Sequence, residues 1–157
     1  MKQPIFEYNP QSRPVRRSFL KRNPYIINII LFVITFFTCT VAGVQWKMMN
    51  PLQLENFNAG LSYAVLILTF LTAHEFGHYI ASRIHKVDAT LPYYIPMPIP
   101  FVLNFGTFGA VIKTRSQIPT KKALFDIGAA GPVAGFIVCV IYLIIGFSTL
   151  PPVEYLY

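Results

Sequence analysis

Three long apolar segments divide the chain, and most of its charged residues lie between or before them. The first apolar segment, residues 25–44, runs for twenty positions without a charge. A helix of that length spans about 30 Å, which is the thickness of the hydrocarbon core of a membrane. Residues 61–82 and 123–150 form the second and third segments. The pattern predicts an all-α membrane protein with three transmembrane helices at these positions.

A fourth uncharged segment, residues 91–112, is predicted not to span the membrane as a helix. Its first half contains four prolines, and proline lacks a backbone N–H and clashes with the preceding helical turn. The alternating prolines impose an extended path, and Gly106 and Gly109 predict a short β-hairpin or edge strand within residues 105–112. We therefore expect a re-entrant, Pro/Gly-rich and β-hairpin-like loop between the second and third helices. Such backbone is tolerated at membrane depth only where protein or a water-filled cavity surrounds it.

The charge distribution predicts how the chain is oriented. Hydrophobic residues make up 54% and charged residues 12% of the chain, against about 25% charged in soluble domains. The net charge is +7, and the basic residues cluster in residues 1–24 and 83–122, with only Lys47 in residues 45–60. By the positive-inside rule, this asymmetry places the N-terminus in the cytosol and requires no nucleic-acid partner.

The same rule assigns the remaining segments. Residues 1–24 are expected to form a basic cytosolic tail that contacts membrane lipid, because clustered basic residues bind anionic headgroups. Residues 45–60 are an external loop, residues 83–122 a cytosolic and re-entrant loop, and residues 151–157 an external end. A cleavable signal peptide is the alternative for the first segment, but its apolar stretch exceeds the usual length of about 7–15 residues. Cys39 and Cys139 lack a CxxC-type spacing and are interpreted as packing residues.

The second helix contains the sequence His74-Glu75-Phe76-Gly77-His78. Residues four apart lie on one face of a helix with Cβ atoms about 5–6 Å apart, so His74 and His78 could bind one Zn²⁺ ion. Glu75, about 100° further around the helix, is placed to take a proton from a zinc-activated water. Charged groups inside a membrane helix cost about 2.5–3.5 kcal/mol each, which argues against a chance occurrence. The motif predicts metal-assisted amide hydrolysis in the cytosolic half of the membrane.

The other polar residues give weaker signals. His85 is interpreted as an interfacial side chain, and Asp126 as a partner of Lys122 or a helix-start acid, rather than as metal ligands. Small residues in 128–135 predict a face that packs closely on the histidine helix. A catalytic zinc site takes three protein ligands, and only two are recognisable.

Four segments in this order resemble the site-2 protease family of intramembrane zinc metalloproteases. They are the His74–His78 motif, Leu91-Pro92, the glycine segment 106–110 and residues 125–135. The resemblance covers about residues 61–150. It implies cleavage of the transmembrane segments of single-span membrane proteins, with the hairpin holding the unwound substrate as an added strand. It also makes Asn104, Gly106 and Gly109 candidate substrate contacts.

The resemblance is incomplete at one point. Members of the family have a later membrane helix with an Asn-Pro segment followed by Asp-Gly, whose aspartate is the third zinc ligand. Here every Asn-Pro pair precedes the histidine motif and Asp-Gly is absent. The chain is therefore expected to be the N-terminal part of the protease core and to bind zinc weakly on its own. A non-catalytic membrane binding module remains an alternative, and a transporter is a further one that lacks support from any internal repeat.

Overall fold

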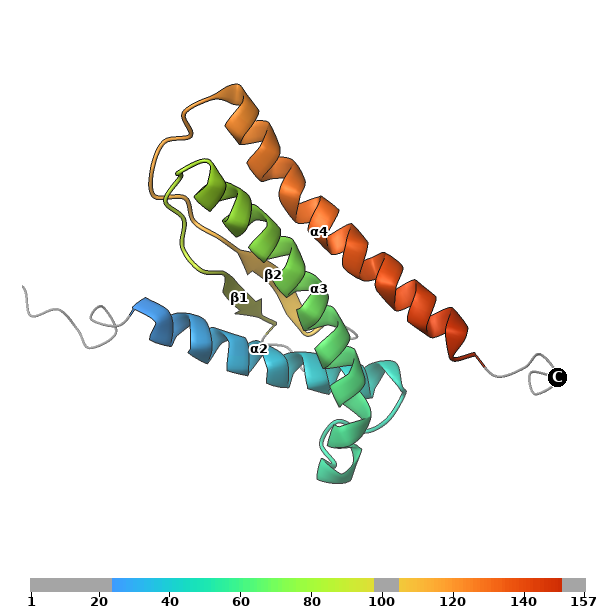
Figure 1. The fold of residues 1–157 in the computed structure, drawn as a ribbon. Coiled ribbons are helices and arrows are strands. Elements are labelled where there is room, and N and C mark those ends of the chain that lie inside the picture. Colours follow the sequence, from blue (N-terminus) through green and yellow to red (C-terminus); the bar gives the residue numbers. More distant parts are fainter. Residues whose placement is uncertain (1–23, 98–104, 151–157) are drawn as a thin grey trace, which may run out of the picture.

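The computed structural model describes residues 24–97 and 105–150, which form three long helices and a two-stranded sheet (Figure 1). All three long helices are apolar and long enough to cross a membrane, which confirms the three helices expected from the sequence. In chain order the elements are α2 (Pro24–Trp46), the short 3-10 helix η1 (Leu54–Asn56), α3 (Phe57–Ile84), β1 (Tyr93–Pro96), β2 (Thr107–Val111) and α4 (Lys121–Ser148).

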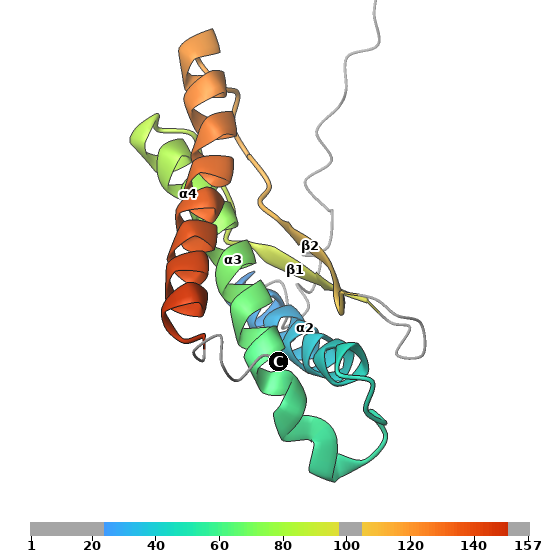
Figure 2. The same ribbon diagram turned by 90° about the vertical axis from the view of Figure 1, so that its right-hand side faces the viewer.

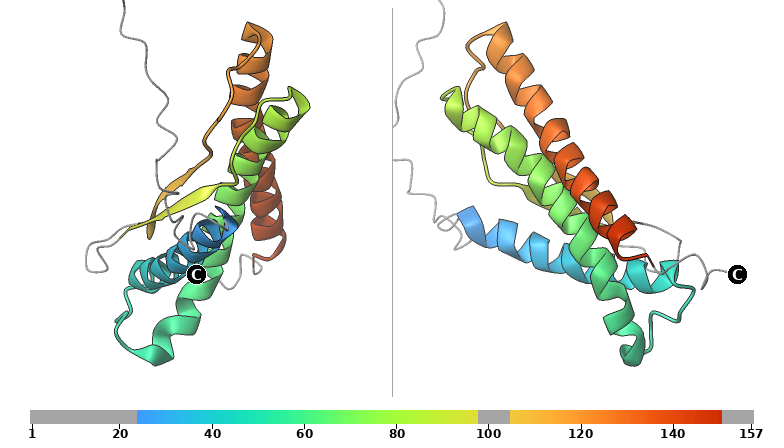
Figure 3. Two further views of the ribbon diagram at one scale, coloured as in Figure 1. Left: turned by 90° about the vertical axis from the view of Figure 1, so that its left-hand side faces the viewer. Right: turned by 45° about the vertical axis from the view of Figure 1, so that its right-hand side comes forward.

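Helix α3 is the central element of the described chain. Figure 2 shows α4 along one side of α3 and the two strands on the other side, and the views in Figure 3 agree. Helix α2 crosses the N-terminal part of α3 and also packs against β1. The hairpin and α4 therefore approach α3 from different sides.

The crossing of α2 and α3 depends on two glycines. A Cβ atom on Gly60 would lie 2.0 Å from the carbonyl oxygen of Thr40, and one on Gly43 would lie 2.7 Å from the carbonyl oxygen of Gly60. The helix backbones touch here because no side chain separates them. Cys39 is buried beside this crossing, as the packing interpretation expected, whereas Cys139 lies on an exposed face of α4.

The two strands form an antiparallel pair that the sequence predicted only in part. The glycine segment is expected to contain a short hairpin or an edge strand, and it forms the single edge strand β2, which pairs with the proline-containing β1. Tyr94 pairs with Ala110 and Pro96 with Thr107, and the register shifts between the two pairs. A shift is expected beside Pro96, because proline has no N–H to donate to the ladder. The entry of this loop into the membrane stays a prediction.

The hairpin is fastened to both neighbouring helices by side-chain hydrogen bonds. On α2, the Thr38 hydroxyl donates to the carbonyl of Gly106 at 2.6 Å. On α3, the Thr72 and Tyr94 hydroxyls are 2.7 Å apart. Tyr94 is also buried in a small core of Cys39, Ala64 and Leu68. These links place the end of β2 beside the middle of α3.

Candidate metal centre

The imidazole rings of His74 and His78 converge. Their Nε2 atoms lie 3.2 Å apart on the face of α3 that packs against α4. Two nitrogen ligands bound tetrahedrally to zinc, each at about 2.0–2.1 Å, are about 3.3 Å from one another. The two rings therefore fit two ligand positions of one zinc ion.

A backbone carbonyl of α4 orients His78. The Nδ1 atom of His78 lies 2.7 Å from the carbonyl oxygen of Ile127. Because a carbonyl oxygen can only accept, Nδ1 carries the proton and the lone pair of neutral imidazole is left on Nε2, the atom that faces His74. A hydrogen-bond acceptor at the other ring nitrogen commonly fixes the tautomer and orientation of a histidine ligand.

Glycines on α4 and α3 make room for the histidines. A Cβ atom on Gly131 would lie 2.1 Å from Nε2 of His78, and one on Gly135 would lie 3.4 Å from Nδ1 of His74. On α3, a Cβ atom on Gly77 would lie 2.4 Å from the carbonyl oxygen of Ala130. The small-residue face of α4 therefore packs on the histidine helix as predicted. Gly128 is the exception, since a Cβ atom there would meet nothing within 4 Å.

Glu75 faces a different neighbour from the histidines. Its side chain is buried, with 6% exposed, and its carboxylate is hydrogen-bonded by the backbone of Ile112, the residue after β2. The bond between Tyr94 and Thr72 ties β1 to α3 one helical turn before Glu75. The site thus contains His78, oriented by α4, with His74 beside it on the same helix, and one carboxylate contacted by the backbone of the hairpin.

A third protein ligand is not found within residues 24–97 and 105–150, where no group of three His, Cys, Asp or Glu residues could hold a metal ion. Asp126 is engaged elsewhere, because its carboxylate lies 2.9 Å from Nε2 of His85, the residue that follows α3. The sequence predicts Asp126 as a partner of Lys122 on its own helix or as a helix-start acid. The observed pair instead joins the C-terminal end of α3 to the N-terminal end of α4.

The three candidate substrate contacts have different surroundings. Gly106 is buried against α2, and its carbonyl accepts from the Thr38 hydroxyl and from the backbone N–H of Met97. Gly109 lies within β2 with open space where a Cβ atom would project. Asn104 lies outside the described residues. The structure therefore gives Gly106 a packing role and leaves Gly109 next to free space.

Three contributors to this site carry no signal in the sequence motif. The carbonyl of Ile127 and the backbone of Ile112 could come from any residue type, so only the fold reveals them. The hydroxyl of Thr72 is two positions before His74, but its partner Tyr94 is distant in the chain. Gly131 and Gly135 are contributors that the small-residue pattern of α4 does indicate.

Converging imidazoles and a buried carboxylate on an apolar helix are the features of a membrane-embedded zinc metalloprotease. The chain belongs to peptidase family M50, the site-2 protease family, whose model matches residues 62–153.

Curated relatives are similar over most of the chain. The protein named Probable zinc metalloprotease EGY1, chloroplastic, of Oryza sativa subsp. japonica is 31% identical over 132 residues, covering 71% of this chain and 22% of the relative. Its namesake in Arabidopsis thaliana is 30% identical over 149 residues, covering 81% and 26%. Probable zinc metalloprotease EGY2, chloroplastic, of Oryza sativa subsp. indica is 30% identical over 124 residues, covering 76% and 22%. The chain thus spans about a quarter of the length of these relatives. No solved structure matches the chain.

Proposed function

We propose that this chain carries part of the catalytic core of an intramembrane zinc metalloprotease that cleaves transmembrane segments. His74 and His78 are the zinc ligands in this proposal, and Glu75 is the general acid and base. The observation that carries it is the 3.2 Å approach of the two Nε2 atoms, with the His78 ring oriented by the carbonyl of Ile127. A histidine that binds a metal almost always donates its other ring N–H to an acceptor of this kind.

The chemistry divides between the metal and Glu75. Bound zinc would polarise a water molecule and lower its pKa toward about 7. The carboxylate of Glu75 takes the proton of the attacking water and later delivers it to the amine that leaves. Its burial between α3 and the hairpin keeps bulk water away from this proton. The backbone of Ile112 holds the carboxylate in position while it acts.

The hairpin supplies a place for the substrate. In the described sheet, β2 pairs with β1 on one edge only, so its other edge has no strand partner there and could pair with an extended peptide. A substrate strand added there would lie beside Gly109, which has no side chain to obstruct it. It would also lie near Ile112, whose backbone contacts the carboxylate of Glu75. The substrates in this proposal are single-span membrane proteins whose helix unwinds to occupy that edge, with Asn104 as a further contact.

The proposed orientation follows from charge. The N-terminus is cytosolic, and the metal centre lies toward the cytosolic side, because Arg83 lies in the last turn of the histidine helix and Lys86 follows shortly after it. Water would reach the site from that side.

Zinc binding and cleavage can be tested separately. We would purify the chain in detergent, determine zinc affinity by competition with a chelator, and follow hydrolysis of a fluorogenic single-span peptide. His74→Ala and His78→Ala should each weaken zinc binding, since each removes a ligand. Glu75→Gln should retain zinc and lose about 10²–10⁴-fold in rate. Zinc affinity that is equal in all three variants and wild type would overturn the ligand assignment.

A non-catalytic binding module is the second candidate. The observation that favours it is the lack of a third ligand among the described residues. It would capture single-span proteins through the open edge of β2 without cutting them. In a pull-down of the same peptide, the module predicts equal capture and no hydrolysis by wild type and Glu75→Gln.

A further inference from the structure

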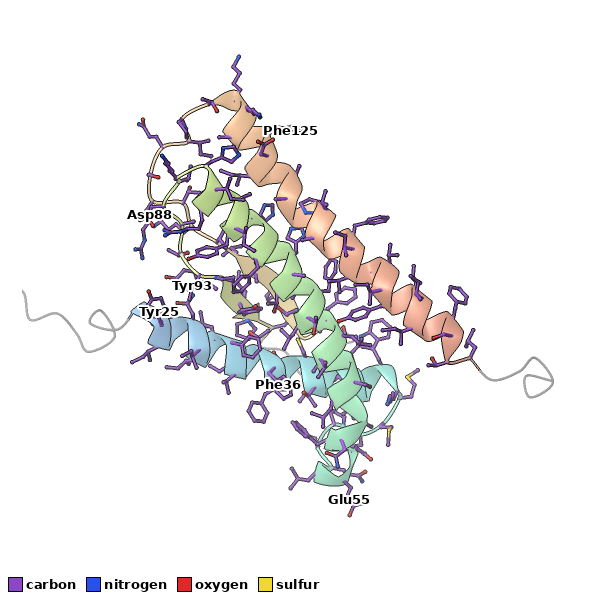
Figure 4. All side chains as sticks on the ribbon, in the orientation of Figure 1. Tyr25, Phe36, Glu55, Asp88, Tyr93 and Phe125 are labelled. Carbon is purple, nitrogen blue, oxygen red and sulfur yellow. The ribbon has the colours of Figure 1, made fainter. Side chains whose placement is uncertain are left out.

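A small polar pocket lies away from the metal centre, where the first turns of α2, the last turns of α3 and the loop before β1 meet. Its volume is about 160 Å³. The side chains used in the argument below are Tyr25, Asn28, Tyr79, Arg83, Tyr93 and Arg115. Figure 4 shows Tyr25, Asp88 and Tyr93 along the same edge of the molecule. One water needs roughly 10–15 Å³ of such space, so the pocket can admit a polar group larger than water.

Hydrogen bonds give the pocket fixed walls. The Nδ2 atom of Asn28 donates to the carbonyls of Leu91 and Pro92, at 3.1 and 2.7 Å. The backbone N–H of Arg115 donates to the carbonyl of Asp88 at 2.7 Å. Next to this bond, Ala89 and Thr114 form an isolated antiparallel β-bridge. The loop before β1 is thereby tied to both α2 and the chain after β2.

The charge of the pocket favours an anion. Arg83 and Arg115 line it, and neither guanidinium is ion-paired with a carboxylate in the described ranges. Asp88 also lines the pocket, so the formal charge of the lining is +1 from two cations and one anion. Three tyrosines and one asparagine add neutral hydrogen-bonding groups. Arginine binds phosphate oxygens in a forked geometry, which suits a phosphate more than a halide.

The position of the pocket points to a lipid. It lies beside the first residues of α2 and the last residues of α3, which are the ends of two membrane-crossing helices. Helix ends lie at the membrane surface whichever way the chain is inserted, and tyrosine is enriched at that depth. A headgroup phosphate would therefore be at the level of this pocket.

We propose that this pocket binds the phosphate of an anionic phospholipid headgroup, with Arg83 and Arg115 as its ligands. The site is separate from the histidine centre and does not depend on the proposed protease function. A bound lipid would link α2, α3 and the chain after β2 at one membrane surface.

The test is a binding titration of the purified chain in neutral detergent by native mass spectrometry. The probes are phosphatidylglycerol, a galactolipid without phosphate, and inorganic phosphate. We expect phosphatidylglycerol to bind, the galactolipid to bind at least tenfold more weakly, and inorganic phosphate not to displace the lipid. Arg83→Gln combined with Arg115→Gln should weaken phosphatidylglycerol binding by about 10–100-fold. Asp88→Asn should tighten it, because the opposing carboxylate is lost.

The matched control removes two cations outside the pocket. Lys121→Gln with Lys122→Gln lowers the net charge equally at the start of α4, and it should leave binding within about twofold of wild type. Equal weakening by both double variants would overturn the proposal in favour of general surface attraction. Equal binding of the galactolipid, or displacement by inorganic phosphate, would overturn the headgroup assignment. A far-UV circular dichroism spectrum unchanged from wild type establishes that the arginine variant is folded.

Discussion

The two sides of α3 hold the candidate site by different means. Toward α4, contact depends on missing side chains: Gly77 and Gly131 allow backbone and imidazole to meet directly. Toward the hairpin, contact depends on polar groups, including the Tyr94 and Thr72 hydroxyls and the backbone of Ile112 at Glu75. The metal ligands are therefore positioned by close packing, and the carboxylate by the backbone of Ile112 at the end of the two-stranded hairpin.

The difference suggests that the α4 side keeps the metal ligands rigid and that the hairpin side admits the substrate. At Gly131 the packing leaves no room for an extra Cβ atom, so it fixes the ring of His78. A two-stranded sheet is marginal by itself and keeps its place through its attachments to α2 and α3. The side of the site that receives substrate in our proposal is thus the side that is less tightly packed. The variants below test this contrast, in order of decreasing expected effect.

The attachment of the hairpin to α2 should fail most severely when Gly106 is changed. Gly106 has a φ of 77°, and a Cβ atom there would lie 2.4 Å from the Cα atom of Cys39. Gly106→Ala should cost about 1–2 kcal/mol for the left-handed backbone and about 1–3 kcal/mol more for the contact with α2. Unfolding by SDS in mixed micelles, followed by circular dichroism, measures the loss.

Gly109→Ala is the matched control for that variant. Gly109 also has a positive φ, of 104°, but open space surrounds its Cβ position. It should show the backbone cost alone. Equal losses in the two variants would mean that contact with α2 does not hold the hairpin.

On the side of α3 that packs against α4, Gly131→Ala should lower zinc affinity. The added Cβ atom would overlap the His78 ring, so the ring must leave the carbonyl of Ile127. We expect zinc affinity to fall by about 10–100-fold, the effect of losing an outer-shell partner. Chelator competition measures it. Gly128→Ala, one turn earlier and without a neighbour at that position, should bind zinc as wild type does; a shared loss would assign the effect to α4 as a whole.

Tyr94→Phe should affect hydrolysis, which depends on the Glu75 carboxylate, without affecting zinc binding. The ring stays packed edge-on to Phe32, with centroids 5.0 Å apart, and only the hydroxyl contact with Thr72 is lost. We expect a stability loss of about 0.5–1.5 kcal/mol, slower peptide hydrolysis and unchanged zinc affinity. Tyr93→Phe, on the opposite face of β1, should leave the rate unaltered. A fall in zinc affinity for Tyr94→Phe would contradict the division between the two sides.

The smallest effect is expected at the far end of the α3–α4 contact. The His85 and Asp126 side chains are 25% and 36% exposed, so solvent screens their pair. Asp126→Asn should cost under about 1 kcal/mol and leave zinc affinity unchanged. The SDS titration, run at low and high salt, checks both the size and the screening. A loss as large as that of Gly106→Ala would show that this pair, rather than the glycine packing, joins the two helices.

The sequence predicts the helices well because membrane thickness sets how long an apolar segment must be. The spacing of His74 and His78 likewise accounts for the contact between their rings, since helical periodicity alone brings them together. The small residues of α4 were enough to identify the face that packs on α3. In each case, the information lies within one local segment.

The remaining features depend on partners that are distant in the chain. β1 pairs with β2, which comes later in the chain. The prolines of the first segment and the glycines of the second predict the shape of each segment, but they do not indicate that the two segments pair. Asp126 had a suitable cation one turn away, and the fold instead presented His85. The carbonyl of Ile127 is the clearest case, because every residue has one and its use depends only on how α4 lies against α3.

The use of the Ile127 carbonyl determines where α4 can tolerate an inserted or deleted residue. Ile127 and Gly131 are one helical turn apart, so the acceptor for His78 and the space for its ring belong to the same turn of α4. Inserting one residue between them would rotate Gly131 by about 100° away from α3 while Ile127 stayed in place. An insertion in residues 116–119 falls before α4 and leaves the spacing between Ile127 and Gly131 unchanged. Tolerance to insertion and deletion should therefore change sharply within a dozen residues.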